Sequence, residues 1–152
     1  VECIVAPVGG GGLASGLVVA RDVLASRCRV IGAEPALAND AARSLRAGRL
    51  EVNPTEPSTI CDGARTLSLG RLNFEILSRG VENIVEVEEE TVSRAVRLLF
   101  ETANLNAEPT GALALAALLQ APACFAGSHV VCIVSGGNVD AQLYAKLISE
   151  GE

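Results

Sequence analysis

The sequence predicts an α/β domain in which a parallel sheet lies between two layers of helices. Short apolar, β-branched segments alternate along the chain with segments of helical periodicity. A run of four glycines joins the first such pair, where a strand would turn into a helix. The 152 residues, 49% of them hydrophobic, fit one domain with a substantial core.

The first strand is expected over residues 3–8, which are mostly apolar, as in strands buried on both faces. Four glycines follow, and then residues 13–24 have the pattern of a helix. Glycines let the backbone turn tightly and direct several N–H groups to one point at a helix N-terminus. The segment predicts an anion cradle, most simply for a phosphate. A turn that merely packs the helix closely on the sheet is the alternative.

The next segments continue the alternation. Residues 29–33 are expected to form a second strand, and residues 39–45 begin a short helix that ends near Gly48. Residues 49–63 contain two prolines and no periodicity, which predicts a long loop of the kind that is often functional. A short helix over residues 72–77 follows.

The second half of the chain repeats the pattern, with a strand expected over residues 83–87. Residues 92–103 place apolar side chains three and four apart, and the acidic run at 88–90 is interpreted as the solvated entry of that helix. Residues 111–119 are apolar all round and predict a buried helix. A core strand over residues 130–134 and a closing helix capped by Asn138 complete the prediction.

Composition excludes several classes of function. A net charge of -6, with one tyrosine, three phenylalanines and no tryptophan, argues against a nucleic-acid surface. No window reaches the roughly 18 apolar residues of a membrane span, and the first residues lack the basic start of a signal peptide. A soluble cytoplasmic protein that acts on small molecules is therefore expected.

The five cysteines form no CxxC pair and are interpreted as small core residues in a reducing compartment. Cys61 lies in the loop-like stretch beside Asp62, where a reactive thiol is the alternative. His129 is interpreted as an ordinary strand-end histidine. The sequence supports neither a zinc site nor a Ser-His-Asp triad.

A second glycine-containing turn, Ser135-Gly136-Gly137-Asn138, follows the last expected strand. Ligands of parallel α/β sheets bind outside the carboxyl ends of the strands. The two turns can therefore face one ligand.

Five segments together resemble a known family. They are, in order, VGGGGL, GAEPALAND, STICDGA, EPTGALALAA and VSGGNVD, and they extend over nearly the whole chain. This combination is similar to the C-terminal half of the serine/threonine dehydratases and serine racemases, which are fold-type II enzymes dependent on pyridoxal phosphate. The resemblance implies that residues 1–152 form a single cofactor-binding domain, the larger domain of a truncated enzyme. It also implies β-elimination from L-serine or L-threonine to a 2-keto acid and ammonia in a homodimer, and it leaves open whether racemisation of serine accompanies the elimination.

The same resemblance assigns roles around the cofactor. Its phosphate would be held by the glycine turn and the next amide, namely Gly9, Gly10, Gly11, Gly12 and Leu13. Ser135 matches the serine whose hydroxyl bonds the pyridine nitrogen, Glu108 matches a glutamate beside the cofactor, and Asp62-Gly63 matches a loop on the substrate side. A neutral hydroxyl leaves the ring a weaker electron sink than a carboxylate would, which suits prompt loss of a β-hydroxyl group.

Glu34, Ala38 and Asp40 match the family's cation site. Two carboxylates and a backbone carbonyl are hard oxygen ligands, which suit Mg²⁺, Ca²⁺ or Mn²⁺ better than zinc. The alternative is that the two acids merely end a strand and begin a helix.

The sequence does not contain the lysine motif by which the family attaches its cofactor. The family attaches the cofactor to a lysine in an S-x-K-x-R motif, whereas the sole lysine here, Lys146, lies in the closing helix and is interpreted as a solvated surface residue. We therefore expect no catalytic residue in this chain and no catalysis by it alone.

Three other interpretations stay open at this point. A cysteine-synthase-like enzyme is disfavoured because its phosphate loop alternates glycine with threonine. A dinucleotide-binding module would use Gly9-x-Gly11, Ala14 and an acid at Glu34. A non-catalytic remnant that still binds the cofactor is the third.

Overall fold

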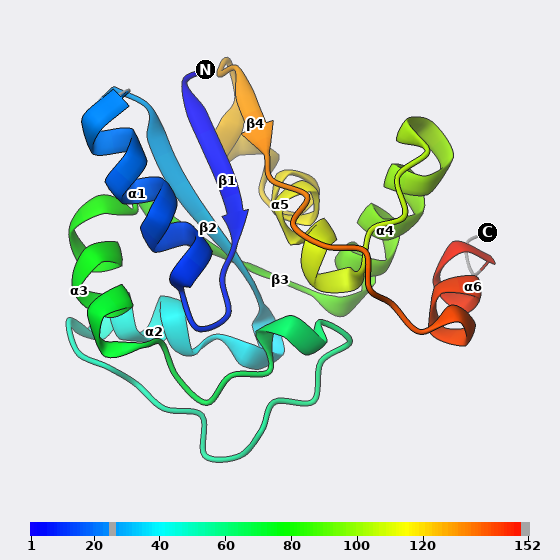
Figure 1. Ribbon diagram of the computed structural model, residues 1–152, viewed down its shortest axis with the longest axis horizontal. Helices are drawn as coiled ribbons and strands as arrows, with labels where there is room; N and C mark the ends of the chain where they lie inside the picture. The colour runs from blue at the N-terminus through cyan, green and yellow to red at the C-terminus, as the bar shows by residue number, and fades with distance from the viewer. Residues whose placement is uncertain (25–26, 150–152) are drawn as a thin grey trace.

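A computed structural model describes residues 1–24 and 27–149 of the chain. Its centre is a parallel sheet in the order β3-β2-β1-β4 (Figure 1). The strands are β1 (Cys3–Pro7), β2 (Arg29–Pro35), β3 (Asn83–Val87) and β4 (Val130–Cys132). Because all four run the same way, their carboxyl ends meet at one edge of the sheet.

Helices α1 (Gly12–Leu24), α2 (Asp40–Ala47) and α3 (Arg71–Gly80) cover one face of the sheet. Their apolar side chains pack against Val8, Val30 and Ile84 in one core cluster. Helix α2 ends at Gly48, whose φ of 67° is the left-handed conformation that glycine adopts without strain.

Helices α4 (Glu89–Ala103), α5 (Pro109–Gln120) and α6 (Ala141–Ser149) lie on the other side of the molecule. Helix α5 packs directly on the sheet and is buried along most of its length, as its apolar sequence predicts. Helix α4 packs on α5, and α6 packs on α4. The two helical layers confirm the predicted three-layer α/β fold.

Three short 3₁₀ turns and one long loop also connect the described helices and strands. The turns are η1 (Ala36–Ala38), η2 (Asp62–Ala64) and η3 (Pro122–Phe125). The loop, residues 48–70, contains η2 and runs below the carboxyl ends of the strands in Figure 1. Its position at this edge of the sheet brings it next to the predicted anion cradle.

Two expectations about the C-terminal part are wrong. The last strand is β4, only three residues long, and it is not a core strand because it pairs with β1 on one side and forms the edge of the sheet. Val131 is accordingly 38% exposed. The cap of α6 is Asp140 rather than Asn138, because Asp140 Oδ1 accepts hydrogen bonds from the amides of Gln142 and Leu143.

The cysteines are all free, and Cys3, Cys28 and Cys61 are buried as expected. Cys124, in the surface turn η3, is exposed and is not a core residue. His129 stands directly before β4 and pairs with Glu2 at the surface. Among the described residues, no helix has the length and apolarity that crossing a membrane requires.

Candidate functional site

The glycine turn between β1 and α1 has a packed side and an open side. A Cβ atom on Gly9 would lie 2.7 Å from the carbonyl oxygen of Gly63, and one on Gly11 would lie 2.9 Å from Leu69 Cδ2. Gly11 also has a φ of 88°, which disfavours any other residue. Nothing lies within 4 Å of the Cβ positions of Gly10 and Gly12. The turn therefore presents bare backbone, at the N-terminus of α1, to an open space.

Strand order places Ser135 beside this turn. Strands β1 and β4 are parallel neighbours, and Ile133 N–H continues the pairing by donating to Val5 C=O at 2.9 Å. The chain therefore leaves β4 at the same edge of the sheet where β1 enters the glycine turn. Both turns line one cavity of about 220 Å³. Its lining consists of Pro7, Gly9, Gly10, Gly11, Gly12, Leu13, Gly63, Thr110 and Ser135.

Glu108 supports the turn formed by residues 135–138 through hydrogen bonds, and it does not line this cavity. Its Oε2 accepts a hydrogen bond from Asn138 N–H at 2.9 Å, and its own N–H donates to Gly136 C=O at 3.1 Å. A Cβ atom on Gly136 would lie 2.5 Å from Glu108 Oε1. A side chain at Gly136 would therefore displace the Glu108 carboxylate from its present position, in which it bonds the turn that carries Ser135.

Residue Thr110 was not singled out by sequence reasoning. Its Oγ1 accepts a hydrogen bond from Gly63 N–H at 3.1 Å, which joins η2 to the N-terminus of α5 at the cavity wall. The neighbouring Asp62 is exposed and turns its carboxylate onto the same Gly63 amide. The signal in the sequence was Pro109, because proline is common at the first position of a helix and Thr110 follows it directly.

The loop before η2 is held by Glu89, the first residue of α4. Its carboxylate accepts hydrogen bonds from Thr59 Oγ1 and from Ile60 N–H, the latter at 2.7 Å. The prediction of a solvated acidic entry is therefore wrong for this residue, because Glu89 is half-buried and bonded to a segment 29 residues away. This contact fixes the loop that continues into Gly63.

The thiol of Cys61 is not poised for reaction. Its side chain is buried, and this desolvation raises the pKa of the Cys61 thiol to about 12. The reactive-thiol alternative is therefore wrong, since a nucleophilic cysteine needs an accessible thiolate.

The three expected cation ligands gather where β2 turns into α2. Glu34, Ala38 and Asp40 are each at most 2% exposed. Glu34 accepts hydrogen bonds from Ala42 N–H at 2.7 Å and Ala41 N–H at 3.2 Å, and so caps α2 from the strand.

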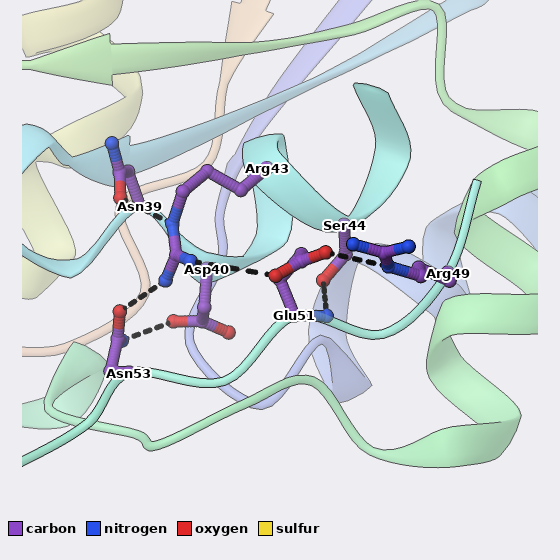
Figure 2. A network of polar contacts seen from close by, with 7 residues as sticks. All are labelled: Asn39, Asp40, Arg43, Ser44, Arg49, Glu51 and Asn53. Carbon is purple, nitrogen blue, oxygen red and sulfur yellow. Dashed lines mark hydrogen bonds and ion pairs between the residues drawn. The ribbon is translucent and has the colours of Figure 1, made fainter. Parts of the chain in front are cut away.

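The carboxylate of Asp40 accepts one hydrogen bond from another side chain. Its Oδ1 accepts a hydrogen bond from Asn53 Nδ2 at 2.9 Å, whereas its buried Oδ2 has no partner among the described residues. Asn53 is fixed in turn by Arg43 Nη2, which donates to Asn53 Oδ1 at 2.6 Å, and Arg43 Nε donates to Asn39 (Figure 2). The network orients Asp40 and leaves one acceptor for a further group.

The charge state of Glu34 is unusual. Burial, and to a smaller extent the Asp40 carboxylate, raise the pKa of Glu34 to about 8. Burial also raises the pKa of Asp40. Two desolvated acids with an unpartnered oxygen fit a hard cation, which would offset the cost of burying their charge. No cluster of three His, Cys, Asp or Glu side chains with metal-site geometry occurs in residues 1–24 and 27–149.

The same geometry contradicts the dinucleotide alternative. That interpretation needs an exposed acid at the end of the second strand to bond a ribose. Glu34 is 1% exposed, and both of its oxygens are bonded to α2. The glycine turn is therefore not accompanied by the exposed acid at Glu34 that would bind the ribose of a dinucleotide.

Comparisons with known proteins identify the family of the chain. Residues 1–136 match the model of the family described as pyridoxal-phosphate dependent enzyme. The chain is 38% identical over 151 residues to an L-threo-3-hydroxyaspartate ammonia-lyase of Saccharomyces cerevisiae, covering 99% of this chain and 46% of that protein. It is 37% identical to serine racemase of Arabidopsis thaliana, covering 92% of this chain and 43% of that protein.

Solved structures give the same result. A threonine deaminase from T.th. superposes with a TM-score of 0.88 at 46% identity, over 91% of this chain and 50% of that one. Maize serine racemase superposes with a TM-score of 0.87 at 34% identity, over 95% of this chain and 45% of that one. The chain spans about half the length of the relatives it matches. It belongs to the fold-type II pyridoxal-phosphate-dependent enzymes and is related to their threonine dehydratases, serine racemases and hydroxyaspartate ammonia-lyases.

Proposed function

We propose that the protein containing this chain catalyses pyridoxal-phosphate-dependent β-elimination of L-serine or L-threonine to a 2-keto acid and ammonia, and we leave open whether it also racemises serine. The cavity between the glycine turn and Ser135 carries the proposal. Relatives that act on threonine, serine and hydroxyaspartate are similarly distant from the chain. They support the reaction class and leave the choice among these hydroxy amino acids open.

The chain's own residues would bind and orient the cofactor. The N–H groups of the glycine turn would bind the phosphate, and α1 would add its positive N-terminal end. The Ser135 hydroxyl would bond the ring nitrogen from the opposite turn, while Glu108 holds that turn in place. The bound cofactor supplies the electron sink for charge that develops at the substrate Cα.

We also infer that residues 1–152 alone bind this cofactor without catalysing the reaction. The sole lysine of the sequence, Lys146, lies on α6, which packs on α4, and Lys146 does not line the cavity. A non-catalytic binding role of the chain is the second candidate function and rests on the same observation. A homodimer of the whole protein is consistent with the exposed Val19, Val23 and Leu24 on α1.

Replacing Gly10 with aspartate should abolish cofactor binding without unfolding the chain. A Cβ atom at Gly10 would meet nothing within 4 Å, so the backbone accepts the substitution, and Gly10 lines the cavity, where the added carboxylate would repel a phosphate. We expect the affinity for pyridoxal phosphate, measured by thermal shift and absorbance, to fall by roughly 100-fold or more. Gly16→Asp is the matched control, because it adds the same charge on open surface of α1 away from the cavity. Equal binding by the two variants would contradict a phosphate site at this turn.

We propose that Glu34, Asp40 and the carbonyl of Ala38 hold Mg²⁺, Ca²⁺ or Mn²⁺. The unpartnered Asp40 Oδ2 and the desolvated Glu34 support this assignment. Asn53 would keep Asp40 in position by occupying its other oxygen.

Burial of Glu34 should make the free energy of unfolding fall as the pH rises. Folding favours the protonated form of Glu34, whose pKa rises from 4.5 to about 8, so the folded state binds more protons than the unfolded state in this interval. Without cation, the free energy of unfolding should therefore fall by roughly 3–5 kcal/mol as pH rises from 4.5 to 8. Urea denaturation across this range measures it.

A divalent cation should act in the opposite sense, because it binds the ionised carboxylates. We expect Mn²⁺ to raise the unfolding free energy more at pH 8 than at pH 5.5. Glu34→Gln should reduce the pH dependence to the part that Asp40 contributes, and it should remove the stabilisation by Mn²⁺. A wild-type stability that is flat over this pH range, or Mn²⁺ stabilisation that Glu34→Gln retains, would refute the assignment.

A further inference from the structure

The packed side of the glycine turn rests on the start of α3. Two donors converge there on the carbonyl oxygen of Gly10, namely Asn73 Nδ2 at 2.6 Å and Gly70 N–H at 3.0 Å. A Cβ atom on Gly11 would lie 3.0 Å from Asn73 Cβ, so the same side chain also supports the next residue of the turn. Asn73 does not line the cavity.

This contact determines where an N–H group points. In a planar trans peptide, the carbonyl oxygen and the following N–H point in opposite directions. The Gly10 carbonyl is turned back toward α3, so the N–H of Gly11 in the same peptide points away from α3. Gly11 lines the cavity, whereas no residue of α3 does.

The orientation of this peptide needs support. Glycine populates both signs of φ with similar ease, and Gly11 already has a φ of 88°. A rotation of the Gly10–Gly11 peptide would turn a carbonyl oxygen into the cavity, where it would repel an anion. The hydrogen bond from Asn73 opposes that rotation from a helix whose own position is fixed by the buried Leu77.

We propose that Asn73 is a positioning residue for phosphate binding: through the Gly10 carbonyl, it holds the Gly11 N–H toward the ligand. The inference rests on the proposed cofactor site and concerns the phosphate end alone. Loss of the Asn73 amide should therefore weaken ligands that carry a phosphate and leave phosphate-free ligands unchanged. A side chain that served only the stability of the chain would affect both classes equally.

The test compares pyridoxal phosphate with pyridoxal, which lacks the phosphate. We expect Asn73→Ala to lower the affinity for pyridoxal phosphate about 10-fold or more, and Asn73→Asp, of nearly the same shape, to lower it further. The affinity for pyridoxal should stay the same in both variants. Ser78→Ala is the control, because it removes a side-chain hydrogen bond to Phe74 C=O from the same helix without touching the turn.

A second readout follows the amide itself. Addition of inorganic phosphate to the ¹⁵N-labelled wild-type chain should shift the Gly11 amide resonance, and the shift should vanish in Asn73→Ala and in Asn73→Asp. Asn73→Asp preserves the packing on Gly11, so it provides the test if the alanine variant fails to fold.

Two failures can be told apart. Wild-type binding that does not distinguish pyridoxal phosphate from pyridoxal overturns the proposed cofactor site itself. Wild-type discrimination that both Asn73 variants retain overturns the role of Asn73 and leaves the cofactor site standing. An equal loss of affinity for both ligands also overturns it, since that result indicates a general structural effect.

Discussion

Replacing Gly111 with alanine should destabilise the chain, although the substitution lies inside a helix. Alanine normally stabilises a helix interior by about 0.5–1 kcal/mol relative to glycine. Here the new Cβ atom would lie 2.5 Å from the carbonyl oxygen and 2.9 Å from the nitrogen of Gly136. Both contacts are with backbone, which cannot rotate away as a side chain can. Overpacking of this kind costs about 1–3 kcal/mol or more, so it outweighs the gain in helix propensity.

Gly16→Ala is the matched control for this prediction. Gly16 lies within α1, and nothing stands within 4 Å of its Cβ position, so alanine should raise the free energy of unfolding by about 0.5–1 kcal/mol. Chemical denaturation of the two variants should therefore give changes of opposite sign. Equal stabilisation by both would show that α5 and the Ser135 turn are not in close contact.

The second large effect is expected from Glu89→Ala. The substitution removes the acceptor for the hydroxyl of Thr59, a residue that is 3% exposed, and for the Ile60 amide. Hydrogen bonds to a charged acceptor contribute about 1.5–3 kcal/mol, and buried donors left without a partner cost about 1–3 kcal/mol. We expect the free energy of unfolding to fall by roughly 3 kcal/mol.

Glu90→Ala tests whether this loss belongs to the contact or to the charge. Glu90 occupies the next position of the same helix turn and is exposed, so the two variants change the charge at the N-terminus of α4 equally. Glu90→Ala should change the stability by less than about 0.5 kcal/mol. Equal stability of the two variants would show that the Glu89 contact contributes nothing beyond its charge.

Glu89→Ala should also weaken cofactor binding, because the loop that Glu89 holds continues to Gly63 at the cavity.

Short stretches of sequence were sufficient to predict the elements whose formation depends on residues near one another in the chain. The glycine turn, the buried helix α5 and strand β3 at residues 83–87 follow from composition and periodicity alone. Errors arose where tertiary context decides. The last strand has the sequence of a core strand, but its place at the edge of the sheet leaves it half-exposed.

The site was less accessible to sequence reasoning than the fold. Ser135 was named from a family resemblance, and its approach to the glycine turn depends on β1 and β4 being neighbours although more than 120 residues separate them. Asn73 reaches Gly10 across 63 positions, and Glu89 reaches Ile60 across 29. No local pattern marks such contacts, because each needs the strand order and the helix packing first.

The most direct test of a cofactor cavity between the two turns is to map ligand binding on the chain by ¹⁵N–¹H correlation spectra. Addition of pyridoxal phosphate should shift the amide resonances of residues 9–13 and of Ser135 together, whereas NAD should not shift them as a group. Shifts confined to one turn, shifts elsewhere in the chain, or a response to NAD alone would contradict the account.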